Sequence, residues 1–204
     1  MKSALVIIDM QNDFMPWGTL PVKNADKIIP TIQKISPNFD LVIATCDYHP
    51  VDHVSFALNH GKKPGECIEV HGVKQQLWPT HCVQGTLGAE IPFALQSCKI
   101  HHKVFKGTEP NIDSYSAFFD NAKKHKTRLD SYLKKKKIDT LFFVGVATEY
   151  CVKFSVLDAL ELGYKVYVIK DACKGVEEKE GKKAFSLMEE KGALLTSSKK
   201  IPKN

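Results

Sequence analysis

The chain has 204 residues, of which 43% are hydrophobic and 25% are charged, a composition typical of a single globular domain with a sizeable core. No apolar run approaches the roughly 20 residues that a membrane-spanning helix needs, so the sequence predicts no membrane segment. The net charge is +6, but Arg128 is the only arginine and the lysines cluster in helical stretches, which favours a solvated helix surface over a nucleic-acid-binding one.

The first predicted element is the apolar run Ala4–Ile8, which is short, ends at Asp9 and indicates a buried strand rather than a signal peptide. The six cysteines form no C-x-x-C pair and are scattered through core-like segments. They are Cys46, Cys67, Cys82, Cys98, Cys151 and Cys173. With no export signal, they are interpreted as reduced thiols, which predicts a cytoplasmic protein.

Strand-like and helical segments alternate along the chain. The predicted strands are Ala4–Ile8, Leu41–Thr45, Ile100–Phe105, Thr140–Val144, Tyr164–Ile169 and Ala193–Thr196. The predicted helices are Ala25–Ser36, Ser116–Lys124, Thr127–Lys136, Cys151–Leu162 and Glu177–Lys191. The strand runs are nearly continuous in apolar residues, which is typical of a parallel sheet covered on both faces. The sequence therefore predicts an α/β, doubly wound three-layer fold with a mainly parallel sheet of about six strands.

Residues 48–99 interrupt this alternation with an irregular stretch rich in His, Pro and Gly. A long irregular insertion inside a compact domain is often functional. The sequence shows no internal repeat, low-complexity tract or linker. Residues 1–204 are therefore predicted to form one domain that carries this insertion.

Reactive side chains stand at or just beyond the ends of four predicted strands. They are Asp9, Asp47, Lys106 and Cys151. In an open parallel sheet, ligands bind beyond the carboxyl ends of the strands, so we expect these four side chains to face one site. Chance places one or two reactive residues at such positions far more readily than four.

Cys151 stands where an apolar strand gives way to a helical pattern. A cysteine near the positive end of a helix dipole favours the thiolate, which is a nucleophile; the alternative is a packed, inert cysteine. Asp9 is interpreted as a general base for this thiol, or else as a turn cap. Lys106 is interpreted as a cation that stabilises the thiolate and an oxyanion, or else as a solvated lysine, whereas Lys103 lies inside the strand.

Asp47 and His49 form a D-x-H pair directly after a strand. Residues i and i+2 of an extended segment project to the same side, so the carboxylate and the imidazole converge. With His53 and His81 from the insertion, they make a candidate site for zinc, iron or manganese, among which the sequence does not choose. The aromatic residues beside these motifs, interpreted as core residues or as walls of a slot for a flat ring, are Phe14, Trp78 and Tyr115.

Taken together, these motifs resemble the isochorismatase-like cysteine hydrolases and, within them, the nicotinamidases. The match runs along almost the full length of the chain. Its motifs are Asp9-Met-Gln-Asn-Asp-Phe14, Asp47-Tyr-His-Pro50, His53-Val-Ser-Phe56, Trp78-Pro-Thr-His-Cys-Val-Gln-Gly-Thr-x-Gly88, Lys106-Gly-Thr108, Asp113-Ser-Tyr-Ser116 and Gly145-Val-Ala-Thr-Glu-Tyr-Cys151. Each motif is weak alone, but the set in this order and spacing is specific.

The resemblance implies roles for the candidate residues. The catalytic triad would be Asp9, Lys106 and Cys151. The ligands of one divalent metal ion, with zinc expected before iron or manganese, would be Asp47, His49 and His81, with His53 as a fourth ligand in only some relatives. The resemblance also implies a cis peptide before Ala147, an oxyanion hole formed by the N–H groups of Ala147 and Cys151, and a nicotinamide ring enclosed by Phe14, Trp78 and Tyr115.

The activity that the resemblance implies is hydrolysis of nicotinamide to nicotinate and ammonia through a cysteine thioester, in NAD salvage, with pyrazinamide as a second substrate. Isochorismatases lack the cysteine, and carbamoylsarcosine-type amidohydrolases lack the metal cluster. The alternatives are another small-amide hydrolase of the same scaffold and a non-catalytic metal- or nucleotide-binding module. No nucleic-acid or membrane partner is expected. The oligomeric state is left open between a monomer and a homo-oligomer, since relatives range from monomers to tetramers and the sequence identifies no interface. The sequence gives no role for Cys46 or for the pair His101-His102.

Overall fold

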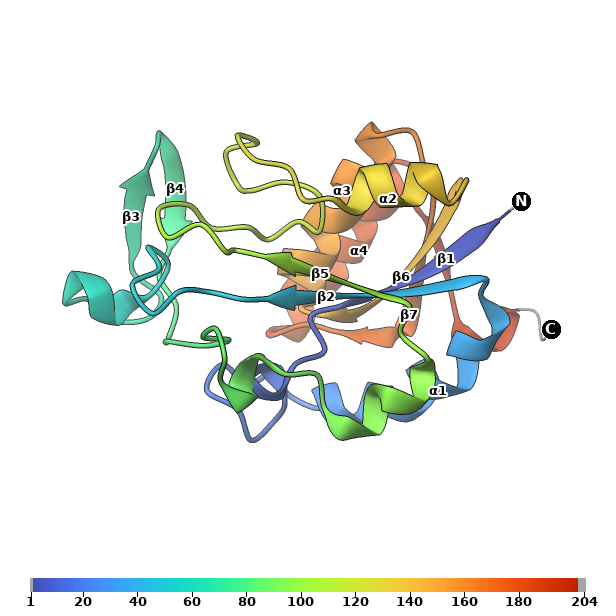
Figure 1. Ribbon diagram of the computed structural model, residues 1–204, viewed down its shortest axis with the longest axis horizontal. Helices are drawn as coiled ribbons and strands as arrows, with labels where there is room; N and C mark the ends of the chain where they lie inside the picture. The colour runs from blue at the N-terminus through green and yellow to red at the C-terminus, as the bar shows by residue number, and fades with distance from the viewer. Residues whose placement is uncertain (1, 202–204) are drawn as a thin grey trace.

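The computed structural model describes residues 2–201, whose strands form one six-stranded parallel sheet and a separate two-stranded sheet (Figure 1). The strands of the large sheet, in chain order, are β1 (Ser3–Ile8), β2 (Leu41–Asp47), β5 (His102–Lys106), β6 (Thr140–Val146), β7 (Lys165–Lys174) and β8 (Leu194–Thr196). All six predicted strands are present, and the predicted α/β fold with a mainly parallel sheet is confirmed.

The strand order of the large sheet is β5-β2-β1-β6-β7-β8, and every neighbouring pair is parallel. The chain moves outward from β1 through β2 to β5, then returns to the other side of β1 as β6. The order of the strands therefore reverses beside β1. In sheets of this kind the crevice beyond the carboxyl ends at the reversal is where ligands bind.

Helices cover both faces of the sheet (Figure 1). They are α1 (Ile29–Ile35), α2 (Leu129–Lys135), α3 (Lys153–Glu161) and α4 (Glu178–Glu190). Alternate residues of β1 point to opposite faces, so Val6 and Ile8 pack in the core beneath α2, α3 and α4, whereas Leu5 and Ile7 pack against α1. Both faces of β1 and β2 are thereby buried. Within residues 2–201, no helix is both long and apolar enough to cross a membrane.

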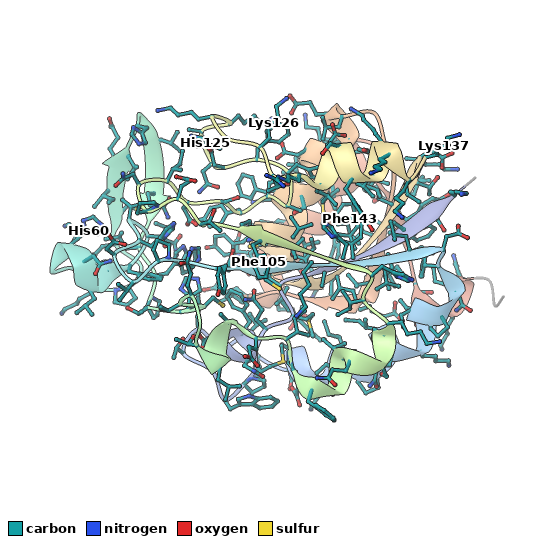
Figure 2. The ribbon with its side chains drawn as sticks, viewed as in Figure 1. His60, Phe105, His125, Lys126, Lys137 and Phe143 are labelled. Carbon is teal, nitrogen blue, oxygen red and sulfur yellow. The ribbon has the colours of Figure 1, made fainter. Side chains whose placement is uncertain are left out.

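The two lysine-rich runs lie on the surface, as the sequence predicts, and apolar strand residues lie in the core. Phe143, in the middle of β6, is fully buried, whereas Lys126 and Lys137 point outward from the surface (Figure 2). The lysines of the two basic runs, at 123–126 and 134–137, are all exposed, in the loop before α2, on α2 or in the turn after it. These side chains therefore lie on a solvated face.

The predicted helix Ser116–Lys124 is absent, and that prediction was wrong. Polar side chains in this segment bind backbone groups that a helix would use. The Asp120 carboxylate accepts hydrogen bonds from the N–H groups of Ala122 (3.0 Å) and His125 (2.6 Å), and the Ser116 hydroxyl accepts one from the N–H of Phe118 (3.1 Å). Asp and Ser side chains compete with helical hydrogen bonds in this way, and here they fix an irregular loop.

The insertion at 48–99 holds regular structure that the sequence reading missed. Strands β3 (Cys67–Val70) and β4 (Val73–Gln76) form an antiparallel hairpin at one end of the molecule (Figure 1). The two turn residues, His71 and Gly72, both have positive φ angles, of 52° and 76°. Two such residues match the right-handed twist of the flanking strands, so the loop closes as a tight hairpin.

The two histidines before and at the start of β5 have structural roles. His101 Nδ1 accepts a hydrogen bond from the N–H of Val42 (3.0 Å), while the N–H of His101 donates to the Val42 carbonyl (2.8 Å). The ring of His102 stacks on Tyr132 of α2, with 4.1 Å between centroids. His101 thus extends the pairing of β5 with β2, and His102 joins β5 to the helix layer.

Candidate active site

The side chains at the ends of β2 and β5 and just beyond β1 and β6 meet around Lys106, at the carboxyl edge of the sheet. The Lys106 ammonium lies 2.9 Å from Asp9 Oδ2, donates a hydrogen bond to Asp47 Oδ1 and donates another to the Ser114 carbonyl (3.0 Å). Its Nζ is also 3.4 Å from Cys151 Sγ. The structure therefore brings together all four residues that the strand ends predicted.

Lys106 is a buried cation held by two carboxylates. Only 2% of the residue is exposed. Burial alone lowers the pKa of an ammonium, but the charges of Asp47 and Asp9 outweigh it and raise the pKa of Lys106 well above its ordinary value. Lys106 therefore carries a positive charge at every physiological pH.

Asp9 leaves β1 with a positive φ of 46°, which turns its carboxylate toward Lys106. The Thr45 hydroxyl donates a hydrogen bond of 2.6 Å to Oδ1. Among the described residues, Oδ2 accepts no well-aligned hydrogen bond, although the Lys106 ammonium is close. Burial raises the pKa of Asp9, Lys106 opposes that rise and Asp47 adds to it. Asp9 therefore combines an open oxygen with a raised proton affinity, as a general base requires.

Cys151 lies in the turn Thr148–Val152 between β6 and α3, where Tyr150 departs from helical geometry. Burial raises the pKa of the Cys151 thiol well above its ordinary value; Lys106 lowers it, and the Asp9 and Asp47 charges raise it further. The expectation of a thiolate favoured by the helix dipole was therefore wrong, because desolvation dominates. The thiol needs a base, and the ligand atoms of Asp9, Asp47 and Cys151 lie within 4.8 Å of one another.

The peptide bond between Val146 and Ala147 is cis, as the resemblance implied. Ala147 and Cys151 both line the same pocket. The oxyanion hole formed by their N–H groups remains a prediction.

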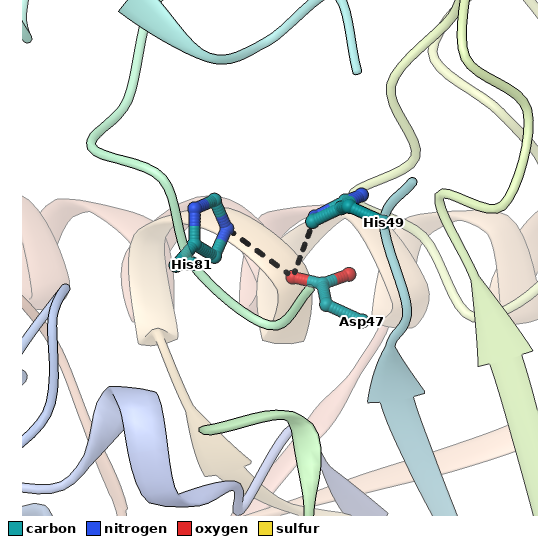
Figure 3. A group of neighbouring side chains, drawn as sticks. All are labelled: Asp47, His49 and His81. Carbon is teal, nitrogen blue, oxygen red and sulfur yellow. Dashed lines mark ion pairs between the residues drawn. The ribbon is translucent and has the colours of Figure 1, made fainter. Parts of the chain in front are cut away.

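Asp47, His49 and His81 form a second cluster beside Lys106 (Figure 3). The Nε2 atoms of His49 and His81 lie 3.7 Å and 3.9 Å from the same oxygen, Asp47 Oδ2. Each ring has its other nitrogen hydrogen-bonded to a backbone carbonyl, at Gly107 (2.8 Å) for His49 and at Pro79 (2.7 Å) for His81. A carbonyl accepts only from an N–H, so in the neutral form of each ring Nε2 is the nitrogen with the free lone pair, and it faces Asp47. This is the donor set and outer-shell pattern of a divalent metal site.

The electrostatics of this cluster favour a cation. Although burial acts in the opposite direction, Lys106 and the two histidines lower the pKa of Asp47, which stays ionised. Burial lowers the pKa of His81 to about 4, so its imidazole is neutral and able to ligate. Burial also lowers the pKa of His49, but Asp47 and Asp113 reverse that effect and raise it. The residues present therefore fit a divalent metal ion.

Gly107 allows His49 to approach the chain closely. It has a φ of +61°, and a Cβ atom there would lie 2.3 Å from His49 Cε1. Only glycine combines this backbone conformation with the space that the imidazole needs. The glycine after Lys106 thus has a steric role, and its carbonyl orients His49.

His53 lies beside Asp47, His49 and His81, the metal cluster, but differs from them in its hydrogen bonds. Its Nε2 contacts the Ile112 carbonyl (3.2 Å), and its Nδ1 contacts the Ser55 hydroxyl (2.7 Å) and N–H (3.3 Å). The carbonyl requires a proton on Nε2, so Nδ1 is the acceptor, and neither nitrogen has a free lone pair. Burial lowers the pKa of His53 to about 4. His53 belongs with His49 and Asp113 in a separate group and not with Asp47 and His81.

The site opens into a pocket of about 460 Å³, counted with its mouth. All three predicted aromatic residues line it, together with Asp47, His81 and Cys151: they are Phe14, Trp78 and Tyr115. Phe14 packs on the His81 ring at 5.5 Å between centroids. On the other wall, Trp78 Nε1 donates to the Tyr115 hydroxyl (3.2 Å). The pocket therefore joins apolar walls to both polar clusters.

Sequence reasoning missed several residues of this pocket. The centroids of the Tyr150 and Trp78 rings lie 5.0 Å apart, and the Tyr150 hydroxyl donates a hydrogen bond to Gln76 Oε1 (3.3 Å). Asp113 Oδ2 accepts a hydrogen bond from Gln75 Nε2 (2.9 Å). Both glutamines come from β4, so the hairpin contacts the pocket wall. Asp113 and Tyr150 stand inside the motifs quoted above, and that position was the sequence signal that could have identified them as pocket residues.

Cys46 is a packed strand residue. It is buried in β2, and burial and Asp9 raise the pKa of its thiol to about 12. Among the described residues it belongs to none of the groups able to hold a metal ion. The structure therefore gives Cys46 a packing role.

Comparison with known proteins places this geometry among characterised relatives. The profile of the isochorismatase domain matches residues 3–200. The nicotinamidase of Escherichia coli strain K12 is 43% identical over 198 residues, which span 94% of this chain and 93% of that protein.

Solved structures agree in fold over the whole chain. A nicotinamidase/pyrazinamidase of Acinetobacter baumanii superposes with a TM-score of 0.95 at 43% identity, covering 98% of both chains. A pyrazinamidase of Pyrococcus horikoshii, solved in complex with zinc, has a TM-score of 0.79 at 35% identity and covers 97% of this chain and 99% of that one.

Proposed function

This chain belongs to the isochorismatase family, and we propose that it is a nicotinamidase, which hydrolyses nicotinamide to nicotinate and ammonia in NAD salvage. The observation that carries the proposal is the convergence of Cys151, Asp9 and Lys106 on an aromatic-walled pocket beside a metal cluster. The relatives described above, named as nicotinamidases and pyrazinamidases, support the same substrate class. Pyrazinamide is proposed as a second substrate.

Acyl transfer begins with the removal of the Cys151 proton. Asp9 takes this proton, and the thiolate attacks the carboxamide carbon. The N–H groups of Ala147 and Cys151 are proposed to bind the resulting oxyanion, and the Lys106 ammonium stabilises the negative charge that moves among sulfur, oxygen and carboxylate. Asp9 then returns the proton to the departing nitrogen, so that ammonia leaves and a thioester remains.

Hydrolysis of the thioester uses the same groups in reverse. Asp9, again ionised, takes a proton from water, and the hydroxide attacks the acyl carbon. The carbon–sulfur bond breaks, nicotinate is released, and Cys151 regains its proton. Phe14, Trp78 and Tyr115 hold the ring between them throughout, which keeps the acyl carbon against the sulfur.

We assign the metal ligands as Asp47, His49 and His81, with zinc as the expected ion because a relative was solved with zinc. When bound, the ion would supply a Lewis acid that orients the pyridine nitrogen of the substrate. His53 is assigned an outer position, because both of its ring nitrogens already have protein partners. The proposed ligand set therefore has three residues and leaves out His53, which the sequence offered as a fourth.

Purified protein is expected to release ammonia from nicotinamide. The measurement is ammonia production with and without nicotinamide, at several protein concentrations. If a folded, zinc-loaded protein releases none, nicotinamide is the wrong substrate. A panel of small carboxamides then tests the alternative of another amidase on the same scaffold.

Removal of the metal is expected to weaken substrate binding more than turnover. The ion is proposed to bind the pyridine nitrogen rather than the amide that reacts, so chelation should raise KM by about tenfold or more and change kcat less. Steady-state kinetics of metal-free and zinc-reloaded protein measure both parameters. An unchanged KM in fully metal-free protein would contradict the ring-orienting role.

A further inference from the structure

Gln11 is a buried amide to which neither the mechanism nor the metal site assigns a role. The residue is 0% exposed. Its Oε1 accepts a hydrogen bond from the N–H of Asp47 (2.8 Å), and its Nε2 donates to the Asp47 carbonyl (2.7 Å) and to the Ala89 carbonyl (2.8 Å). A single side chain therefore binds both backbone groups of the residue that Lys106 and the metal cluster share.

The position of Gln11 explains why Asp47 needs this support. The paired register of β1 with β2 runs from Ala4–Leu41 to Ile7–Ala44. Beyond it, Asp9 turns the chain away with its positive φ. Asp47, at the end of β2, therefore has no β1 backbone beside it on that edge. The Gln11 amide presents a donor nitrogen and an acceptor oxygen to Asp47 in one plane and takes the place of the missing strand residue.

Asp13, two residues after Gln11 in the chain, binds the backbone of the loop that carries His81. Its Oδ2 accepts a hydrogen bond of 2.7 Å from the N–H of Cys82, which has a φ of 46°. The carboxylate is enclosed, because a Cβ on Gly88 would lie 2.1 Å from Oδ2. Asp13 thus fixes the backbone immediately after a metal ligand.

We propose that Gln11 and Asp13 are positioning residues that set the affinity of the metal site. They act through the backbone of Asp47 and of the His81–Cys82 segment, and they contact neither the ion nor the substrate. The inference rests on the proposed assignment of the metal ligands. It joins the metal site to the segment 9–14, which also carries the general base and one aromatic wall. Partners beyond the ligands typically change metal affinity by about 10- to 100-fold.

The test is the zinc affinity of metal-free protein, measured by competition with a chromogenic chelator and without nicotinamide. Gln11→Met keeps the length of the side chain but removes the amide, and Asp13→Ala removes the acceptor for Cys82. Each is expected to weaken zinc binding by about 10- to 100-fold. Asp13→Asn keeps an acceptor oxygen and is expected to restore affinity to within about threefold of the parent.

Asn12→Ala is the matched control. Asn12 Nδ2 donates to the Leu87 carbonyl (2.9 Å), in the same loop that Gln11 contacts at Ala89, but it holds no ligand-bearing segment. Its zinc affinity is expected to stay within about threefold of the parent. Asp47→Ala, which removes a ligand, confirms that zinc binds at the cluster.

Zinc affinity equal to the parent in folded Gln11→Met and Asp13→Ala would overturn the proposal, even if both variants unfold at lower temperature. The proposal also fails if Asn12→Ala loses as much affinity as they do, or if the parent binds no zinc at the cluster. Should Gln11→Met not fold, Gln11→Asn, which is too short to reach both Asp47 groups, takes its place with the same expectation. A parent that binds zinc at the cluster but does not hydrolyse nicotinamide would refute the proposed function and leave this inference standing.

Discussion

Replacing Cys151 by alanine is expected to abolish ammonia release from nicotinamide, with a loss in kcat on the order of 10⁴-fold or more. No thioester can form without the sulfur, and Cys151 is the one cysteine that lines the pocket among the described residues. The fold and the metal cluster should persist, because the substitution leaves Asp47, His49 and His81 and their backbone partners unchanged. The measurements are ammonia release, the unfolding transition and zinc content.

Cys173→Ala serves as the control for that variant. Cys173 is a buried thiol in β7, and burial raises its pKa to about 12, but it lies outside the pocket. Its replacement removes a similar volume from the core and should leave kcat near that of the parent. If Cys151→Ala kept its activity, the thioester mechanism would be wrong. If both variants lost activity equally, the effect would be one of packing rather than of chemistry.

Replacing Lys106 by methionine is expected to remove activity and to destabilise the fold. The change leaves the Asp9 and Asp47 carboxylates buried together without the cation that neutralises them. Breaking a buried pair in this way costs about 3–5 kcal/mol of unfolding free energy. The carboxylates should take up a proton in response, because like charges in a buried site raise the pKa of one of them. Urea unfolding at neutral and at acid pH measures the loss and its expected reduction at low pH.

Lys103→Met provides the comparison, since Lys103 stands on the same strand but is exposed. Its replacement should change the unfolding free energy by no more than about 0.5 kcal/mol. Equal stability of the two variants would show that Lys106 is not the cation of a buried pair. The double variant Lys106→Met with Asp47→Asn should recover part of the lost stability, because it removes one of the uncompensated charges.

Local sequence patterns predicted the strands that are buried on both faces. The runs that became β1, β2 and β6 are apolar on both faces because both are covered, and that burial is visible in the sequence itself. Lys106 and the three predicted residues around it were found from the rule that parallel strands present their carboxyl ends to a ligand. This rule needs only the ends of the strands and not their order.

The features that sequence reading missed depend on hydrogen bonds between distant residues or on short polar segments. Gln11 meets residues 36 and 78 positions away, so no local pattern shows its role. The loop at 116–124 has a helical spacing of apolar residues, but Asp120 binds its backbone instead. The strands of the hairpin have only four residues each. For Cys151, the helix dipole was visible in the sequence, whereas the larger cost of burial was not.

The Lys106 ammonium has more polar neighbours than it has hydrogens to donate. An ammonium group has three N–H bonds, yet four atoms surround this one: a carboxylate oxygen from Asp9, another from Asp47, the Ser114 carbonyl and the Cys151 sulfur. At any moment one of the four is left without a donor. When charge passes from carboxylate to sulfur and back, a rotation about one carbon–nitrogen bond can reassign the three hydrogens. The Lys106 ammonium can thus supply hydrogen bonds to three of its four neighbours at each stage of the proposed proton transfer between Cys151 and Asp9.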